Sequence, residues 1–122
     1  MSFLSGLFHK NEPWKNTLLR DMFVLSFRDL KFDKDCSPII EEIGFDVGFS
    51  ASKVIKIFEN MYSIPTIHPK DKECKIYYLR CLVRTCVAGG KKHEGSLDIT
   101  LVIANELGLS SDYVADMVHY YT

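Results

Sequence analysis

The chain aligns with itself when it is shifted by 60 positions. Residues 18–61 then lie over residues 78–121 without a gap, and eight of the 44 aligned positions are identical, where about two or three would be expected by chance. Two copies with so long a period indicate a pseudo-twofold duplication rather than a solenoid. We therefore predict a single domain over residues 1–122, with repeat one at 18–61, a linker at 62–68 and repeat two at 78–121.

The first helix of each copy is predicted from apolar residues that recur at helical spacing. They are Leu18, Leu19, Met22, Phe23 and Phe27 in repeat one, and Tyr78, Leu79, Leu82, Val83 and Val87 in repeat two. Pro13 and Pro69 precede these patterns. Proline is favoured in the first turn of a helix, where its missing N–H costs nothing, so we expect both prolines at these helix starts.

The second helix of each copy is expected to end at a glycine, Gly48 or Gly108, because glycine readily adopts the left-handed C-cap conformation. In repeat one this helix should begin near Ser37. The third helix should begin at a serine cap, Ser50 or Ser110. The residues that it is predicted to bury are Val54, Ile57 and Phe58 in repeat one, and Val114, Met117 and Val118 in repeat two.

Strand patterns are nearly absent, so we predict an all-α fold. Neither three-helix unit could bury its apolar stripe alone. The two units are therefore expected to pack face to face as one helical bundle, because burial of apolar surface contributes ~25 cal/mol per Å² to folding.

The composition narrows the class of protein. The net charge is −1, so there is no overall basic field to attract nucleic acid or an anionic membrane. The four cysteines lack the spacing of a zinc site or of a disulfide framework. No apolar run approaches the roughly 18 residues that span a bilayer, and the N-terminus does not have the pattern of a signal peptide. We expect a cytoplasmic protein with reduced thiols and no cofactor.

The ends of the two second helices resemble a known family. Residues 46–50 read Asp-Val-Gly-Phe-Ser, and residues 106–110 read Glu-Leu-Gly-Leu-Ser. Both are similar to the helix ending of the tellurite-resistance TerB family, over about residues 18–121. The resemblance implies a helical domain linked to bacterial stress response. It also implies a divalent-cation site at an Ala-Asp-Gly corner with an acidic residue seven positions later, and of that set this chain keeps only Asp29.

The acidic corner supplies the only candidates for a metal site. They are Asp29, Asp33 and Asp35, with Glu41 and Glu42 nearby. Hard cations require several converging carboxylates, but lysines interrupt this run and no glycine supplies the turn of a calcium loop. The alternative is a solvated loop that caps the next helix, and we therefore assign no metal ligand.

A helix-turn-helix pattern occurs at the end of repeat two, with Ala104, Gly108 and Val114 at the spacing of a tight helix crossing. The helix that would enter DNA carries Asp112 and Asp116 and no lysine or arginine, and carboxylates repel phosphates. The same pattern in repeat one places Lys53 and Lys56 on the corresponding helix. We interpret both corners as packing features, with nucleic-acid binding as the alternative.

The remaining motifs do not form a catalytic site. No histidine can be placed beside a cysteine from the sequence, so we predict no enzyme activity and no catalytic residue. The apolar segment Phe3–Phe8 is expected to dock on the domain itself, although contact with a membrane or a partner is left open. We predict a non-enzymatic, TerB-like interaction domain with an unknown protein partner, and self-association as a homo-oligomer is left open.

Overall fold

The computed structural model describes residues 12–90 and 94–122. Its helices are α2 (Trp14–Leu25), α3 (Ser37–Asp46), α4 (Ala51–Glu59), α5 (Lys72–Gly89), α6 (Glu94–Glu106) and α7 (Ser111–Tyr121). Two short strands, β1 (Phe27–Arg28) and β2 (Lys31–Phe32), and two single-turn 3₁₀ helices, η1 (Lys34–Cys36) and η2 (Met61–Ser63), complete these ranges. The described chain is mostly helical, which agrees with the predicted all-α class.

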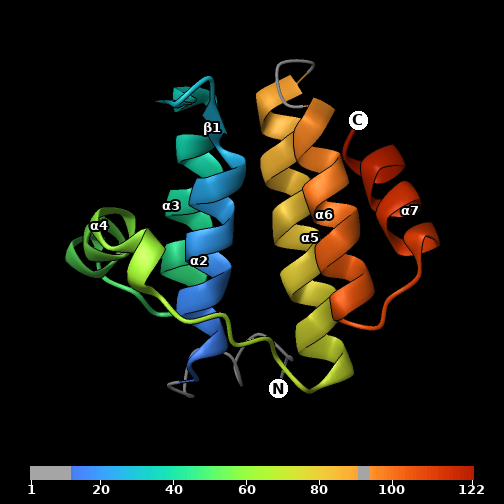
Figure 1. The fold of residues 1–122 in the computed structure, drawn as a ribbon, viewed down its shortest axis with the longest axis horizontal. Coiled ribbons are helices and arrows are strands. Elements are labelled where there is room, and N and C mark those ends of the chain that lie inside the picture. Colours follow the sequence, from blue (N-terminus) through green and yellow to red (C-terminus); the bar gives the residue numbers. More distant parts are fainter. Residues whose placement is uncertain (1–11, 91–93) are drawn as a thin grey trace.

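The helices form two groups of three (Figure 1). Helices α2, α3 and α4 lie on one side, and α5, α6 and α7 lie on the other, with α2 packed against α5. Shifting α3 by 60 positions places it within α6, and the same shift places α4 within α7. The superposition of residues 18–61 on residues 78–121, and the duplication that it would express, stay predictions.

The two loops that follow α3 and α6 have the same backbone geometry. Gly48 has φ of 87° and Gly108 has φ of 77°. The amide of Phe49 donates to the Gly44 carbonyl at 2.8 Å, and the corresponding amide, that of Leu109, donates to the Ala104 carbonyl at 2.9 Å. The prediction that both glycines end helices in the left-handed conformation is confirmed.

Apolar side chains of both groups form one core cluster. Helix α5 lies at its centre and contributes the fully buried Tyr78, Leu79 and Leu82, which pack with residues of α2 such as Leu18 and Met22. In the third helices, Ile57 and Val114 are buried as predicted. Val54, Met117 and Val118 are only half-buried. The prediction is wrong for Phe58, which is 37% exposed: its ring lies at the edge of the core, between the buried Phe23 and the rings of Phe27 and Phe32 in a hairpin.

That hairpin corrects the sequence interpretation at two points. Phe27 was predicted to extend the first helix, but α2 ends at Leu25 and Phe27 pairs with Phe32 in a two-stranded antiparallel ladder. The ring of Phe27 stacks on Phe58, with centroids 6.1 Å apart and an interplanar angle of 11°, which explains the early end of the helix. Pro69 is also outside its predicted place, since α5 begins three residues later at Lys72.

The segment between the two groups is fastened to α2. The Thr17 hydroxyl donates to the Pro65 carbonyl at 3.1 Å and accepts the Ile67 amide at 3.0 Å. One guanidinium nitrogen of Arg20 donates to the Ile64 carbonyl at 2.7 Å, and another donates to Asp21 at 2.9 Å. Tyr78 of α5 donates to the other oxygen of Asp21. Hydrogen bonds therefore connect the predicted linker, through Arg20 and Asp21 of α2, to α5.

Candidate functional site

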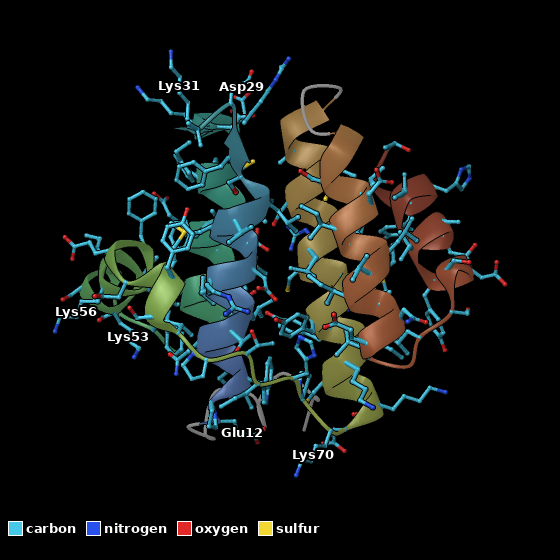
Figure 2. All side chains as sticks on the ribbon, viewed as in Figure 1. Glu12, Asp29, Lys31, Lys53, Lys56 and Lys70 are labelled. Carbon is cyan, nitrogen blue, oxygen red and sulfur yellow. The ribbon has the colours of Figure 1, made fainter. Side chains whose placement is uncertain are left out.

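Helix α4 presents most of its side chains to solvent. It begins at Ser50, whose hydroxyl accepts the Lys53 amide at 3.1 Å as predicted for the cap. Of its own residues only Ile57 is buried. Figure 2 shows Lys53 and Lys56 at this helix, and both are exposed. Because α4 contributes little to the core, its exposed residues are free to serve other purposes.

An apolar groove runs between α3 and α4, with a volume of about 410 Å³. Its lining is Glu41, Phe45, Phe49, Ala51, Val54 and Ile55. The side chain of Phe45 is 80% exposed and that of Ile55 is 57% exposed. Contiguous exposed apolar surface, where it is extensive, marks sites of interaction, so the groove with these two side chains at its edge is a candidate site.

The aligned positions of the second group carry different residues. Sixty positions after Phe45 and Ile55 stand Asn105, on α6, and Ala115, on α7. The turn after α6 has a left-handed glycine, like the turn after α3, without large apolar residues at these two positions. A turn of this kind therefore does not require Phe45 or Ile55.

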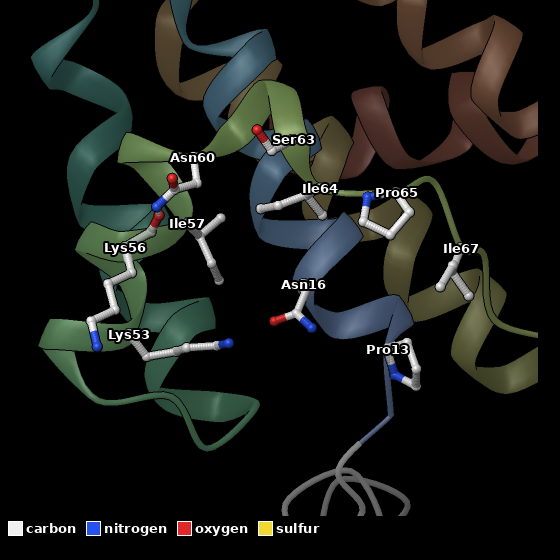
Figure 3. A pocket seen from close by; sticks show the side chains of 10 residues that line it. All are labelled: Pro13, Asn16, Lys53, Lys56, Ile57, Asn60, Ser63, Ile64, Pro65 and Ile67. Carbon is white, nitrogen blue, oxygen red and sulfur yellow. Dashed lines mark hydrogen bonds between the residues drawn. The ribbon is translucent and has the colours of Figure 1, made fainter.

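A second cavity lies on the other side of α4, between that helix, the start of α2 and residues 63–67. Its volume is about 430 Å³. Figure 3 shows its lining, which is Pro13, Asn16, Lys53, Lys56, Ile57, Asn60, Ser63, Ile64, Pro65 and Ile67. In this view Lys53 extends from α4 toward α2, and the carboxamide oxygen of Asn16 points back toward it. Apolar side chains, the Lys53 ammonium group and a few polar atoms thus share one cavity, while the Lys56 ammonium is directed away from α2 in this view.

The predicted metal candidates do not converge. Asp29 lies in the hairpin turn with its side chain 89% exposed. Asp33 accepts the Asp35 amide at 2.9 Å and so caps η1. In the part of the chain that the structure describes, no three His, Cys, Asp or Glu residues gather where they could hold a metal ion. The position of Asp33 agrees with the alternative interpretation of this corner, a loop that caps the following helical turn.

The helix-turn-helix pattern corresponds to real turns whose exposed surfaces differ in charge. Gly44 is buried against Val54 in the first corner, and Ala104 is 1% exposed in the second. Small residues therefore stand at the tight crossings, as predicted. Asp112 and Asp116 are exposed on α7, whereas Lys53 and Lys56 are exposed on α4.

The thiols are poorly suited to act as nucleophiles. All four cysteines are buried. Burial raises the pKa of Cys81 to about 12 and that of Cys86 to about 11, so their thiolate forms are scarce near neutral pH. Cys74 lines a cavity together with His68, but its sulfur faces a carboxylate oxygen of Asp71 at 4.0 Å, while His68 Nδ1 lies 3.9 Å from Glu106.

Some predictions fall on residues outside the described ranges. They concern the apolar segment Phe3–Phe8 and positions 91–93 of repeat two. Among the described helices, none combines the length and the apolar character that crossing a membrane requires.

The comparisons with known proteins return nothing: no protein-family model, no curated protein and no solved structure matches this chain. The sequence could have pointed to the two surfaces of α4 through differences between the repeats. Phe45 and Ile55 align with Asn105 and Ala115, and Lys56 aligns with Asp116.

Proposed function

We propose that this chain is a non-enzymatic, TerB-like interaction domain that binds a segment of a partner protein in the groove between α3 and α4. The observation that carries the proposal is the exposure of Phe45, at 80%, beside the exposed Ile55 at the edge of this groove. By its resemblance to the TerB family, the domain would act in the cytoplasm in a bacterial stress response.

Burial of these side chains would supply a useful binding free energy. Covering a large apolar side chain contributes about 1.5–3 kcal/mol, and aromatic side chains at the centre of an interface are often the residues that dominate affinity. Phe45 also has firm support, because it projects from an ordered helix beside Phe49, which packs partly on the core. Little order therefore has to be gained by this surface on binding.

The groove favours one kind of occupant, an amphipathic helix. Residues of the two helices α3 and α4 form its walls, and the bound helix would place apolar residues three or four positions apart on Phe45 and Ile55. Glu41 is exposed at one edge of the groove. A lysine or arginine beside the apolar stripe of the bound helix would face this carboxylate, which fixes the direction of binding.

The chemistry of the described residues supports an interaction role rather than catalysis. Cys81 and Cys86 have raised pKa values because they are buried. The carboxylate of Asp21 is taken up by Arg20 and Tyr78. The thiols of Cys81 and Cys86 are thus buried, and the carboxylate of Asp21 is held in structural contacts. These three groups are therefore poorly placed to act as nucleophile or base.

Nucleic-acid binding is the second candidate function, and one observation favours it: Lys53 and Lys56 are both exposed on α4, the helix that corresponds to a recognition helix. Glu59 is exposed on the same helix. Phosphate contacts contribute most of the affinity for DNA, so two lysines beside a carboxylate supply little of it.

The test is a selection of helical peptides from a random library on the immobilised full-length protein. We expect the recovered peptides to carry two large apolar residues at a spacing of three or four and a basic residue next to them. Their binding should weaken by about tenfold or more on Phe45→Ala or Ile55→Ser, which corresponds to the loss of one buried side chain. The matched control is Asn105→Ala, at the equivalent position of α6, which should leave binding unchanged.

Three outcomes would overturn the proposal. One is a library that yields no peptide sensitive to Phe45→Ala. Another is sedimentation that shows a dimer dissociated by Phe45→Ala, which would make a second copy the occupant of the groove. The third is salt-sensitive binding of duplex DNA that is lost in Lys53→Glu with Lys56→Glu and retained in Phe45→Ala, which would promote nucleic acid as the partner.

A further inference from the structure

We propose that the cavity between α2 and α4 is a binding site for a small amphiphilic anion: a carboxylate or phosphate group with a short apolar body and a hydroxyl group. This site lies on the opposite side of α4 from the groove and does not depend on the proposed partner. Its volume, about 430 Å³, is within the range of roughly 300–1,000 Å³ that is usual for small-molecule pockets.

The apolar part of the site is formed by Ile57, Ile64 and Ile67. Ile57 is 3% exposed and forms the floor, whereas Ile67 is 41% exposed and stands nearer the surface. Pro13 and Pro65 add further apolar surface at the edges. A short hydrocarbon chain would cover these side chains and gain roughly 0.8 kcal/mol for each methylene group buried.

The charged part of the site is formed by Lys53 and Lys56, which are one turn apart on α4. The Lys53 ammonium lies 5.6 Å from the centroid of the Phe49 ring, so this side chain touches both surfaces of α4. Both lysines line this cavity, and neither is among the residues that line the groove. An anion beside the Lys53 ammonium would draw the flexible Lys56 side chain toward it, and hydrogen bonds to these ammonium groups would be stronger than those between neutral groups.

A cavity of the second group has a different charge pattern. It is lined by Arg80, Asp116, Met117, Tyr120 and Tyr121, so one basic and one acidic residue face it, and Asp116 stands 60 positions after Lys56. Tyr113 stands at the position that corresponds to Lys53. The fold therefore forms such a cavity without lysines, and their presence beside α2 is a property of this site alone.

The hydroxyl group of the proposed ligand is inferred from Asn16. Its carboxamide oxygen is buried and, within residues 12–90 and 94–122, has no hydrogen-bond partner. A buried acceptor without a donor costs free energy, so such an atom in a cavity wall calls for a ligand. Figure 3 shows this oxygen directed into the cavity, where a hydroxyl group on the bound anion could donate to it.

The cavity wall formed by residues 64–67, opposite α4, is ordered in the absence of a ligand. Residues 64–67 are fastened to α2 by the hydrogen bonds of Thr17 and Arg20. At the other end of this segment the Ser63 amide donates to the Asn60 carbonyl at 2.9 Å. A preformed wall of this kind avoids the cost of ordering a loop on binding.

The experiment is a titration of the full-length protein, followed by two-dimensional NMR, with four probes of equal chain length. They are octanoate, 3-hydroxyoctanoate, octylammonium and 1-octanol. We expect saturable shifts at Asn16, Ile57 and Ile64 with the two carboxylates, tighter binding of 3-hydroxyoctanoate, and no saturable shifts with octylammonium or octanol. Octyl phosphate in place of octanoate then identifies the preferred anionic group.

Three variants separate the parts of the site. Lys56→Glu should weaken octanoate binding by about tenfold or more, whereas the exposed Lys31→Glu on the hairpin and Phe45→Ala in the groove should leave it unchanged. Asn16→Leu should remove the preference for 3-hydroxyoctanoate and keep the binding of octanoate. Since each variant changes a partly or fully exposed residue, thermal melting is the check that the fold persists.

The proposal fails if octylammonium and octanoate shift the same residues equally, which would show apolar adsorption without charge recognition. It also fails if Lys56→Glu retains full octanoate binding. Shifts produced only by vesicles of phosphatidylglycerol, and not by the soluble carboxylates, would make this face a membrane contact instead.

Discussion

Gly44 of α3 lies so close to Val54 of α4 that a β-carbon on residue 44 would stand 2.8 Å from Val54 Cγ2. Carbon atoms that are not bonded pack at about 3.5–4.0 Å. The two helices therefore cross at this distance only because residue 44 has no side chain. Ala104 occupies the corresponding place in α6, so the second crossing accommodates one more carbon atom.

The first prediction is that Gly44→Ala destabilises the protein. The added methyl group overpacks the crossing, which typically costs about 1–3 kcal/mol and exceeds the gain of about 0.5–1 kcal/mol from replacing glycine within a helix. Urea denaturation followed by circular dichroism measures the difference. Gly44→Ala combined with Val54→Ala should recover part of the loss, because the clashing methyl group is removed.

Gly95 is the matched control, since a β-carbon there would meet nothing within 4 Å. Gly95→Ala in the first turn of α6 should leave the free energy of unfolding unchanged or raise it slightly. Equal losses for the alanine variants of Gly44 and Gly95 would contradict the close crossing.

The second prediction concerns Gly108, whose φ of 77° is in the left-handed region. The space around it is open, so the cost of Gly108→Ala is that of the backbone conformation alone, about 1 kcal/mol. Gly108→Asn should cost less, because asparagine adopts this conformation more readily than alanine does. Melting temperatures that do not follow the order Gly, Asn, Ala would show that this turn changes its geometry.

The third prediction is a dependence of stability on pH through Glu42. Arg84 Nη1 donates to Glu42 at 2.7 Å, and this hydrogen bond lowers the pKa of Glu42 in the folded protein. A lowered pKa contributes stability above the unfolded value, and the contribution is lost as the pH falls through the folded value. Glu42→Gln should therefore cost about 0.5 kcal/mol at neutral pH, and this cost should begin to shrink below about pH 4, near the unfolded value, and disappear once the pH is below the lowered folded value.

The expected cost of Glu42→Gln is small for two reasons. The Glu42 side chain is 49% exposed, so solvent screens the pair. Asp46 also has a raised pKa, from burial and from Glu42, and the variant relieves part of that cost. Denaturation of both proteins across the acid range measures the difference. A gap between them that persists unchanged in acid would contradict the role of the ion pair.

The fourth prediction is that the thiols do not react in the folded protein. At about pH 8 the thiolate fractions of Cys81 and Cys86 are very small, because their pKa values are raised to about 12 and about 11. The four buried cysteines should be labelled by Ellman's reagent only after addition of denaturant. Rapid labelling of one thiol under native conditions would reveal a local opening at that residue.

Helix positions could be predicted from the sequence where a local rule determined them. The serine at position 50 caps α4 through its own hydroxyl, and the glycines at 48 and 108 end their helices because few other residues adopt a positive φ. These features depend on neighbouring residues and a known backbone preference. They require no knowledge of the rest of the fold.

The hairpin could not be predicted in this way. Asp29 and Leu30 both have positive φ, at 50° and 67°, without glycine to indicate such a turn. The hairpin is held by contacts distant in sequence, such as the stacking of Phe27 on Phe58. In a short apolar pattern, Phe27 fits a helix as well as a strand, and only the position of α4 decides between them.

The candidate sites could be predicted from the sequence only in part: differences between the repeats point to α4, but not to a groove or a cavity beside it. Phe45 and Ile55 fit an apolar helical pattern, and burial is the usual outcome for such residues. Asn16 belongs to no sequence motif. Its role can be inferred only from the folded structure, in which it lines the cavity with a carboxamide oxygen that is unpartnered among the described residues. Lys53 and Lys56 were noticed for their charge, but the cavity beside them depends on residues 63–67 being fastened across α2.

The sparse burial of α4, with Ile57 alone in the core, has a consequence for the order in which the protein opens. Helix α5 buries residues along its whole length, so its amide hydrogens should exchange with solvent only on global unfolding. Those of α4 should exchange through a local opening of lower free energy. Such an opening would remove one wall from the groove and from the cavity at once, and a molecule bound at either place would slow exchange throughout α4.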